Sequence, residues 1–190
     1  LILDEIPTGL GKTGRMFAFE HDGVVPDIVT LGKALGGGIL PIAAVVARRD
    51  LDVCGDFAIG HYTHEKNPVT ARAALETLAV IREEGLVQRA AELGTHALER
   101  LRAALGDCRI VGDIRGRGLM FGIEIVEDRD SRQAAKERAE RICYRCLEAG
   151  LSFKISAGCV LTLSPPLVIG RADLDRALDI VGEAIRAEAA

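Results

Sequence analysis

Two residues of this sequence have the types and the spacing that chemistry at a binding site requires. Asp4 ends a short apolar run and is followed by a glycine-rich stretch at residues 9–14. Lys33 follows a second apolar run, residues 27–31, and stands just before the glycines at 36–38. Ligands of open α/β sheets gather at the carboxyl ends of the strands. The pattern therefore predicts a carboxylate and an amine at neighbouring strand ends.

An acid and an amine in this arrangement suit a cofactor that needs an anion at one edge and a covalent amine at the other. A carboxylate can keep a pyridine nitrogen protonated, which lets the ring accept the electrons of a carbanion. A lysine can form an imine and later carry a proton. Pyridoxal 5'-phosphate is such a cofactor. Taken singly, each residue is more typical of a solvated surface, so the prediction depends on the pair.

The glycine-rich stretch also matches the nucleotide-binding pattern G-x-G-x-x-G, but its context argues against that interpretation. A dinucleotide site needs these glycines to open a helix between two strands. Here the short interval before the next strand is interrupted by Gly23 and Pro26. A P-loop would need a glycine where Ile6 stands. We therefore interpret the glycines as turn residues that allow positive φ.

The elements that must position Asp4 and Lys33 follow from the apolar pattern. Near-continuous apolar runs indicate strands covered on both faces in a largely parallel sheet, and longer amphipathic segments indicate helices. Residues 1–84 are then the C-terminal part of a cofactor-binding large domain, and residues 85–190 a small α+β domain. The expected strands are 1–4, 27–31, 41–47, 109–114, 119–126, 151–155 and 160–163, and the expected helices are 69–84, 86–105, 132–149 (closed by Gly150) and about 174–185.

Composition narrows the class of protein. The 190 residues carry a formal net charge of -4 and contain no Trp, two Tyr and five Phe, which disfavours nucleic acid as a ligand. No apolar run approaches the roughly 18 residues that span a bilayer. Leu1 already lies within a strand pattern, so we expect the sequence to be the C-terminal part of a longer chain.

The five cysteines show no disulfide-framework spacing, which favours a reducing, cytoplasmic setting. Cys143 and Cys146 have the C-x-x-C spacing of a redox or zinc motif, but no second ligand pair follows them. Both also lie on an apolar stripe of the helix expected at 132–149. We therefore favour core packing, and we expect no metal site.

Beyond the Asp4–Lys33 pair, the order of several motifs resembles the class III pyridoxal-phosphate aminotransferases, which have the aspartate-aminotransferase-like fold (fold type I). The matching segments are DEIPTGLGKTG at 4–14, YTHEKNP at 62–68, GDIRGRGLMFGIE at 112–124 and LSPPL at 163–167. The resemblance spans essentially the whole chain. Within the family, the 2,2-dialkylglycine decarboxylases look especially similar.

This resemblance implies roles for particular residues. Asp4 pairs with the pyridine nitrogen of pyridoxal 5'-phosphate, Lys33 forms the Schiff base, and Ile6 packs on the face of the ring. Thr63 binds the cofactor phosphate of the partner subunit, which implies a homodimer with shared active sites. The partners would be a small-molecule amino substrate and an oxo-acid acceptor, with neither nucleic acid nor a membrane.

Other polar residues in the matching segments have less definite roles. We favour a structural role in the small domain for Arg115 and Arg117. His61 and His64 flank Thr63, where they would be either near the substrate or ordinary loop histidines.

Two positions depart from the family. Family aminotransferases commonly carry an arginine that clamps the substrate carboxylate where this sequence has Thr162, and a threonine cannot make that bidentate contact. Pro7 replaces a residue that contacts the ring oxygen in the decarboxylase. We therefore expect transamination and keep four alternatives open: an ammonia-lyase, a phospho-lyase, a decarboxylase and a racemase. A non-enzymatic reading, in which the isolated segment only folds or dimerises, also stays open.

Overall fold

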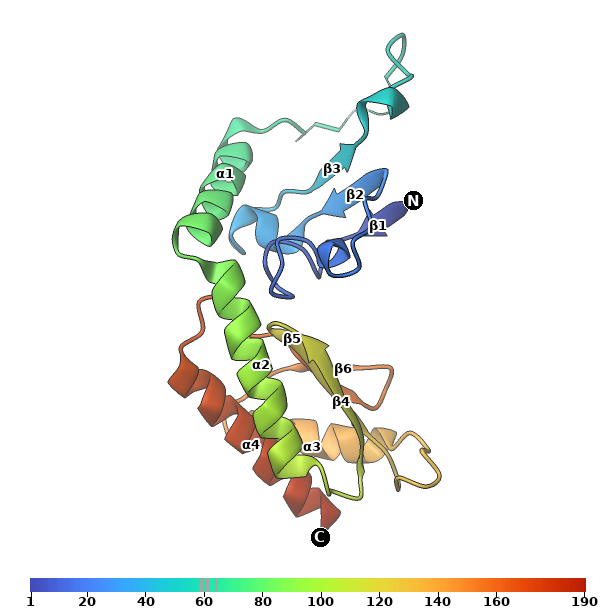
Figure 1. Ribbon diagram of the computed structural model, residues 1–190, viewed down its shortest axis with the longest axis vertical. Helices are drawn as coiled ribbons and strands as arrows, with labels where there is room; N and C mark the ends of the chain where they lie inside the picture. Colours follow the sequence, from blue (N-terminus) through green and yellow to red (C-terminus); the bar gives the residue numbers. More distant parts are fainter. Residues whose placement is uncertain (59, 61, 64) are drawn as a thin grey trace. The chain divides into compact units, whose positions relative to one another are not determined.

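The computed structural model describes residues 1–58, 60, 62–63 and 65–190. The chain packs as two compact units, Leu1–Gln88 and Arg89–Ala190. Both combine helices and sheets, as the α/β class predicts (Figure 1). No helix in the described ranges is long and apolar enough to cross a membrane.

The first unit contains a three-stranded sheet in the order β1-β2-β3, formed by β1 (Ile2–Asp4), β2 (Ile28–Leu31) and β3 (Ala44–Ala47). β1 and β2 are parallel, with Asp4 opposite Thr30, so their carboxyl ends meet at one edge. β3 runs antiparallel to β2, unlike the parallel neighbour that its apolar run suggested. An apolar strand has the same residue pattern in either direction, so the sequence alone does not reveal this reversal.

Short 3₁₀ helices and one long helix complete this unit. The 3₁₀ helices are η1 (Ala18–His21), η2 (Lys33–Gly36) and η3 (Arg49–Leu51), and the long helix is α1 (Pro68–Glu83). Asn67 caps α1 because its side chain accepts a hydrogen bond from the Val69 amide, and Pro68 occupies the first turn, where its missing N–H costs nothing. α1 packs against η2, the segment that begins at Lys33.

The second unit contains a four-stranded antiparallel sheet in the order β4-β5-β7-β6. Its strands are β4 (Val111–Arg117), β5 (Met120–Ile125), β6 (Lys154–Ser156) and β7 (Val160–Leu163). Leu161 and Leu163 are buried, whereas Val160 and Thr162 lie on the opposite face, as the two-residue period of a strand requires. The sheet therefore has one apolar face and one face with polar residues.

Three helices cover the apolar face: α2 (Leu86–Leu105), α3 (Lys136–Glu148) and α4 (Arg171–Ala189) (Figure 1). α2 matches the expected helix at both ends. α3 begins four residues later than expected because residues 132–135 are not helical: Arg132 has φ of +53° and Ala134 bridges to Val126. Gly150 follows α3 with φ of 87°, the left-handed conformation typical of a residue just beyond a helix end.

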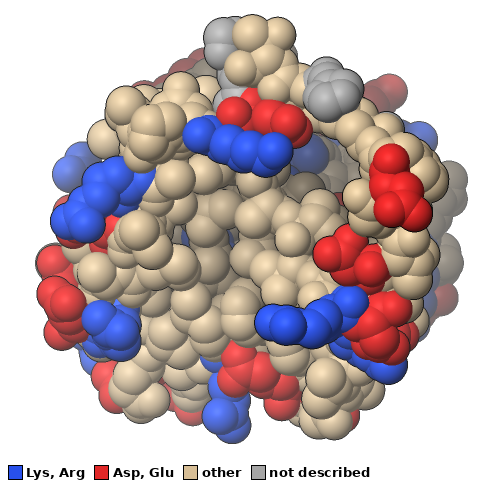
Figure 2. All heavy atoms as spheres, turned by 90° about the horizontal axis from the view of Figure 1, so that it is seen from above, with Lys and Arg blue, Asp and Glu red and all other residues tan. Residues whose placement is uncertain are grey.

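The core of the second unit is one cluster of apolar side chains from these helices and strands. Leu101, Ile123 and Ile142 are almost fully buried in it. Cys146 is fully buried there, which agrees with core packing for this residue, whereas Cys143 is only half-buried and does not belong to the cluster. On the face shown in Figure 2, basic and acidic side chains are interspersed around a broad area of uncharged residues.

Candidate active site

The carboxylate of Asp4 stands at the end of β1 in a defined orientation. Its Oδ1 accepts hydrogen bonds from the Ile6 amide at 2.9 Å and from the Thr30 hydroxyl at 3.3 Å. Thr30 is the residue paired with Asp4 on the neighbouring parallel strand. The side chain is exposed, so the carboxylate can meet a ligand. Sequence reasoning missed Thr30, because its role depends on the register of the two strands.

Lys33 stands at the end of the neighbouring strand, two residues beyond Leu31 of β2. It is exposed and has φ of +45°, in the left-handed region that residues with a Cβ seldom adopt. Such a conformation costs about 1–3 kcal/mol and concentrates at functional sites. The structure therefore brings Asp4 and Lys33 to the adjacent strand ends where the sequence predicts them.

Ile6 lies beside this pair. A Cβ added at Gly32 would lie 3.5 Å from Cγ1 of Ile6, so the isoleucine side chain packs over the residue that precedes Lys33. A branched apolar group in this position can support one face of a flat ring.

The loop that follows β1 is held by a buried acid. Glu5 is 3% exposed, and its carboxylate accepts hydrogen bonds from the Thr8 hydroxyl and the Phe19 amide. Gly11 and Gly14 have φ of 89° and 84°, as predicted for turn residues, and no helix opens on them as a dinucleotide site would require. Glu5 therefore stabilises the loop that carries Ile6.

Lys12 in the same loop is a second amine with unusual chemistry. It is partly buried, and burial lowers its pKa to about 8. Removal from water disfavours the charged ammonium and leaves more of the nucleophilic free amine near neutral pH. An experiment that assigns covalent chemistry to a lysine of this unit must therefore distinguish Lys33 from Lys12.

Thr63 is not joined to the residues at the ends of β1 and β2. It is exposed and occupies a turn in the connection between η3 and α1. No hydrogen bond or ion pair among the described residues joins it to Asp4 or Lys33, so its role stays a prediction. His61 and His64 lie outside the described residues.

Thr162 occupies the polar face of the sheet in the second unit. Its hydroxyl donates to Oγ of Ser156 at 2.9 Å. Thr162 therefore carries no guanidinium at the position where the resemblance leads one to expect an arginine.

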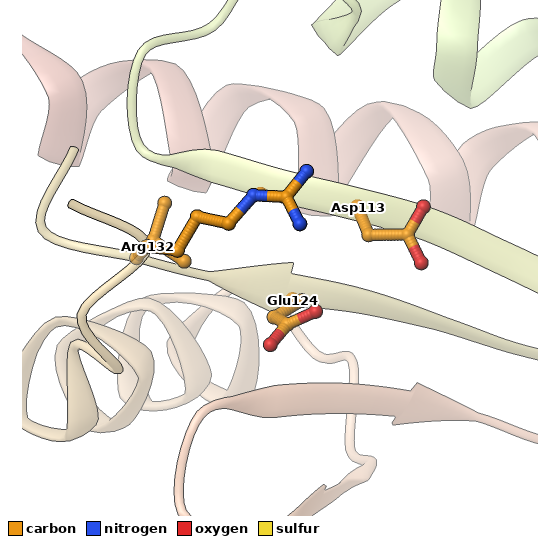
Figure 3. A pocket seen from close by; sticks show the side chains of 5 residues that line it. Asp113, Glu124 and Arg132 are labelled. Atoms are coloured by element: carbon orange, nitrogen blue, oxygen red, sulfur yellow. The ribbon is translucent and has the colours of Figure 1, made fainter. Parts of the chain in front are cut away.

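A cavity of about 310 Å³ opens on the same unit, lined by Gly112, Asp113, Glu124, Val126 and Arg132. Figure 3 shows the Arg132 side chain extending over the strands that carry the two carboxylates. Arg115 donates to both Asp113 and Glu124 at 2.9 Å, which agrees with the structural role predicted for it. These ion pairs raise the pKa of Arg115, chiefly through the Asp113 hydrogen bond. Among the residues that the structure describes, no cluster of His, Cys, Asp or Glu could hold a metal ion.

The geometry of the first unit and the order of the motifs agree with the family comparison. Residues 1–185 match the protein family described as "Aminotransferase class-III". The chain belongs to this family, whose members are pyridoxal-phosphate-dependent enzymes.

Relatives of known activity catalyse different reactions. The chain is 41% identical over 185 residues to the (R)-1-hydroxy-2-aminoethylphosphonate ammonia-lyase of Vibrio splendidus, covering 97% of this chain and 39% of that protein. It is 43% identical over 186 residues to the leucine/methionine racemase of Thermococcus litoralis (97% and 42%). It is also 43% identical over 185 residues to the acetylornithine aminotransferase of Methanothermobacter thermautotrophicus (97% and 45%). The chain thus spans less than half the length of these three relatives.

Solved structures share the fold. An aminotransferase from Bacillus anthracis superposes with a TM-score of 0.93 at 33% identity, covering 98% of this chain and 44% of that one. The ornithine aminotransferase of Toxoplasma gondii, described with pyridoxal phosphate at its active site, gives a TM-score of 0.88 at 36% identity (98% and 43%). The fold is therefore that of part of a fold type I aminotransferase.

The residues present fit pyridoxal phosphate. Asp4 offers an anchored, exposed carboxylate for the ring nitrogen, and Ile6 offers an apolar surface for the ring. Lys33 offers an exposed amine at the adjacent strand end. These are the three kinds of group that the pyridine ring and its aldehyde require.

Proposed function

We propose that the protein is a pyridoxal-phosphate-dependent aminotransferase that moves an amino group from a small-molecule amine or amino acid to an oxo-acid acceptor. The observation that carries this proposal is the placement of Asp4 and Lys33 at the adjacent carboxyl ends of β1 and β2. Membership of the class III family supports it.

Different residues of this chain would have different roles in the reaction. Lys33 would hold the cofactor through Nζ, and the same Nζ, as a free amine, would take a proton from the substrate carbon and give it up again later in the reaction. Asp4 would keep a proton at the pyridine nitrogen, and Thr30 holds the Asp4 carboxylate in place for this role. Ile6 would pack on one face of the ring and shield it from water. Bound pyridoxal phosphate supplies the electron sink that makes the substrate carbon acidic.

A second function has a specific observation in its favour. Thr162 lacks the guanidinium that holds the carboxylate of ordinary amino acids and oxo-acids in family aminotransferases. An ammonia-lyase and a racemase are among the relatives at 41% and 43% identity. Proton removal by Lys33 can also lead to loss of a leaving group or to reprotonation on the opposite face. Elimination or racemisation is therefore the alternative to transamination, with phospho-lyase and decarboxylase chemistry further options of the same site.

A half-reaction assay on the full-length holoenzyme separates these functions. Transamination predicts that an amine donor, without acceptor, converts the cofactor to its amine form and yields one equivalent of carbonyl product. Ammonia and carbonyl product released over many turnovers without acceptor would support elimination instead. Loss of optical activity without either product would support racemisation.

We further propose a cytoplasmic homodimer in which Thr63 of each chain binds the cofactor phosphate of the other. The first unit has large exposed apolar side chains that an interface would cover: Val25, Ile39 and Phe57 are 87%, 86% and 66% exposed. The division into a cofactor-binding part at residues 1–84 and a small domain at 85–190 belongs to the same proposal.

A further inference from the structure

Another cavity, of about 220 Å³, lies beside β4 in the second unit. It adjoins the cavity of Figure 3, with which it shares Gly112 and Asp113. Two basic side chains, Arg102 from α2 and Arg129 from the connection between β5 and α3, also line it. Pockets for drug-sized ligands measure about 300–1,000 Å³, so this cavity suits a small ion or a single chemical group.

Main-chain carbonyl groups hold the two arginines in the cavity. β4 lies at the edge of the sheet, where carbonyls lack a neighbouring strand. Nη2 of Arg102 donates to the Ile114 carbonyl at 3.2 Å, and Nε of Arg129 donates to the Val111 carbonyl at 3.0 Å. Nη2 of Arg129 also donates to the carbonyl of Gly106, just beyond the end of α2. Both guanidinium groups are therefore fixed against the backbone.

These contacts leave the two positive charges without a counter-ion. A carbonyl is neutral, and no ion pair in the described ranges joins Arg102 or Arg129 to a carboxylate. The Asp113 carboxylate is paired with Arg115 at 2.9 Å, and the Asp128 carboxylate accepts hydrogen bonds from its own loop. Each guanidinium has five N–H groups, of which the carbonyls use one on Arg102 and two on Arg129. Two charges and several donors are thus available to one ligand.

We propose that Arg102 and Arg129 form a binding site for a phosphate-type dianion, either the free ion or the phosphate group of a larger molecule. Two positive charges match a group that carries about -1.5 to -2 at pH 7, whereas a carboxylate would neutralise only one of them. The planar donor fork of guanidinium also suits the oxygens of a phosphate. The site belongs to the second unit alone, so it does not depend on the roles proposed for Asp4 and Lys33.

Calorimetric titration of the full-length holoenzyme with inorganic phosphate, methyl phosphate and acetate tests this site. Sodium chloride keeps the ionic strength constant, because salt screens exposed charges. The variants are Arg102→Gln, Arg102→Lys and the control Arg176→Gln. Arg102 is the arginine to replace, since its one carbonyl bond is long and its loss should disturb the fold little. Arg176 is exposed on α4 and does not line the cavity, so the control removes the same charge elsewhere.

The variants should separate in a definite order. We expect Arg102→Gln to raise the dissociation constant of phosphate at least about tenfold, the effect of losing one charge-assisted hydrogen bond. Arg102→Lys keeps the charge and should bind phosphate more tightly than Arg102→Gln. Arg176→Gln should stay within about threefold of the wild type. Binding of inorganic phosphate alone would assign the free ion, and binding of methyl phosphate as well would assign the phosphate group of a larger molecule.

Three results would overturn the inference: no phosphate binding to the wild type, equal binding to Arg102→Gln and the wild type, or acetate binding as tight as that of phosphate. Far-UV circular dichroism checks that Arg102→Gln folds. If it does not fold, the wild type alone decides. Phosphate should then slow the modification of Arg102 and Arg129 by phenylglyoxal, measured by peptide mass spectrometry, and leave Arg176 unchanged. Equal modification with and without phosphate would show that the site does not exist.

Discussion

Gly94→Ala should destabilise the second unit, although alanine is the better helix former. Gly94 lies within α2, where its missing side chain lets the helix touch the turn between β4 and β5. A Cβ at this position would lie 2.1 Å from the carbonyl oxygen of Gly118 and 2.5 Å from its Cα. Carbon contacts are favourable at about 3.5–4.0 Å, so the helix and the turn would have to separate by more than about 1 Å.

The size of the effect follows from two opposing terms. Alanine gains about 1 kcal/mol over glycine in a helix interior. Overpacking a rigid site costs about 1–3 kcal/mol, and the upper end applies because backbone lies on both sides of this contact. We therefore expect Gly94→Ala to lower the free energy of unfolding by about 2 kcal/mol.

Gly182 in α4 provides the matched control. A Cβ there would meet only the guanidinium of Arg186, at 3.5 Å, which is an ordinary contact with a flexible group. Gly182→Ala should consequently raise the free energy of unfolding by up to about 1 kcal/mol. Urea denaturation followed by far-UV circular dichroism measures both variants. Equal stability of the two alanine variants would refute the claim that the Gly94–Gly118 approach positions α2 on the sheet.

Three further results are expected. Glu188→Gln should lower stability at pH 7 by about 1 kcal/mol. The Arg141 hydrogen bond, followed by nearby arginine charges, lowers the pKa of Glu188. The deficit should therefore persist above pH 4.5 and disappear as the pH falls through the lower pKa of the folded state; a constant deficit down to pH 2 would contradict this. Asp4→Asn should weaken cofactor retention on dialysis roughly 10- to 150-fold, whereas Asp56→Asn, an exposed acid of the same unit, should not. Burial raises the pKa of the Cys146 thiol to about 11, so native protein should resist iodoacetamide at this residue by peptide mass spectrometry.

The helices, strands and strand ends that the sequence predicted are those that show as apolar periodicity or as the end of an apolar run. α2, β7 and the strand ends that carry Asp4 and Lys33 were predicted for this reason, because apolar elements show their period and their ends in the sequence. The turn after β1 was predictable from its glycines, since Gly11 and Gly14 do need positive φ.

What the sequence did not reveal depends on which strands become neighbours. The antiparallel direction of β3 and the anchoring of Asp4 by Thr30 both follow from strand pairing. The pairing of Lys154 with Thr162 is a third case, because they are eight positions apart along the chain and only the β6–β7 register brings them together. The departure at Thr162 was visible in the sequence, but its neighbouring ammonium was not.

Peptide mapping after borohydride reduction of the full-length holoenzyme tests the central claim most directly. Reduction makes the link between the cofactor and its lysine permanent, so the modified peptide identifies the residue. We expect a single pyridoxyl label on Lys33, and Lys33→Ala should lose that label with no transfer elsewhere. A label on Lys12, whose pKa of about 8 makes it the competing amine of this unit, would contradict the account.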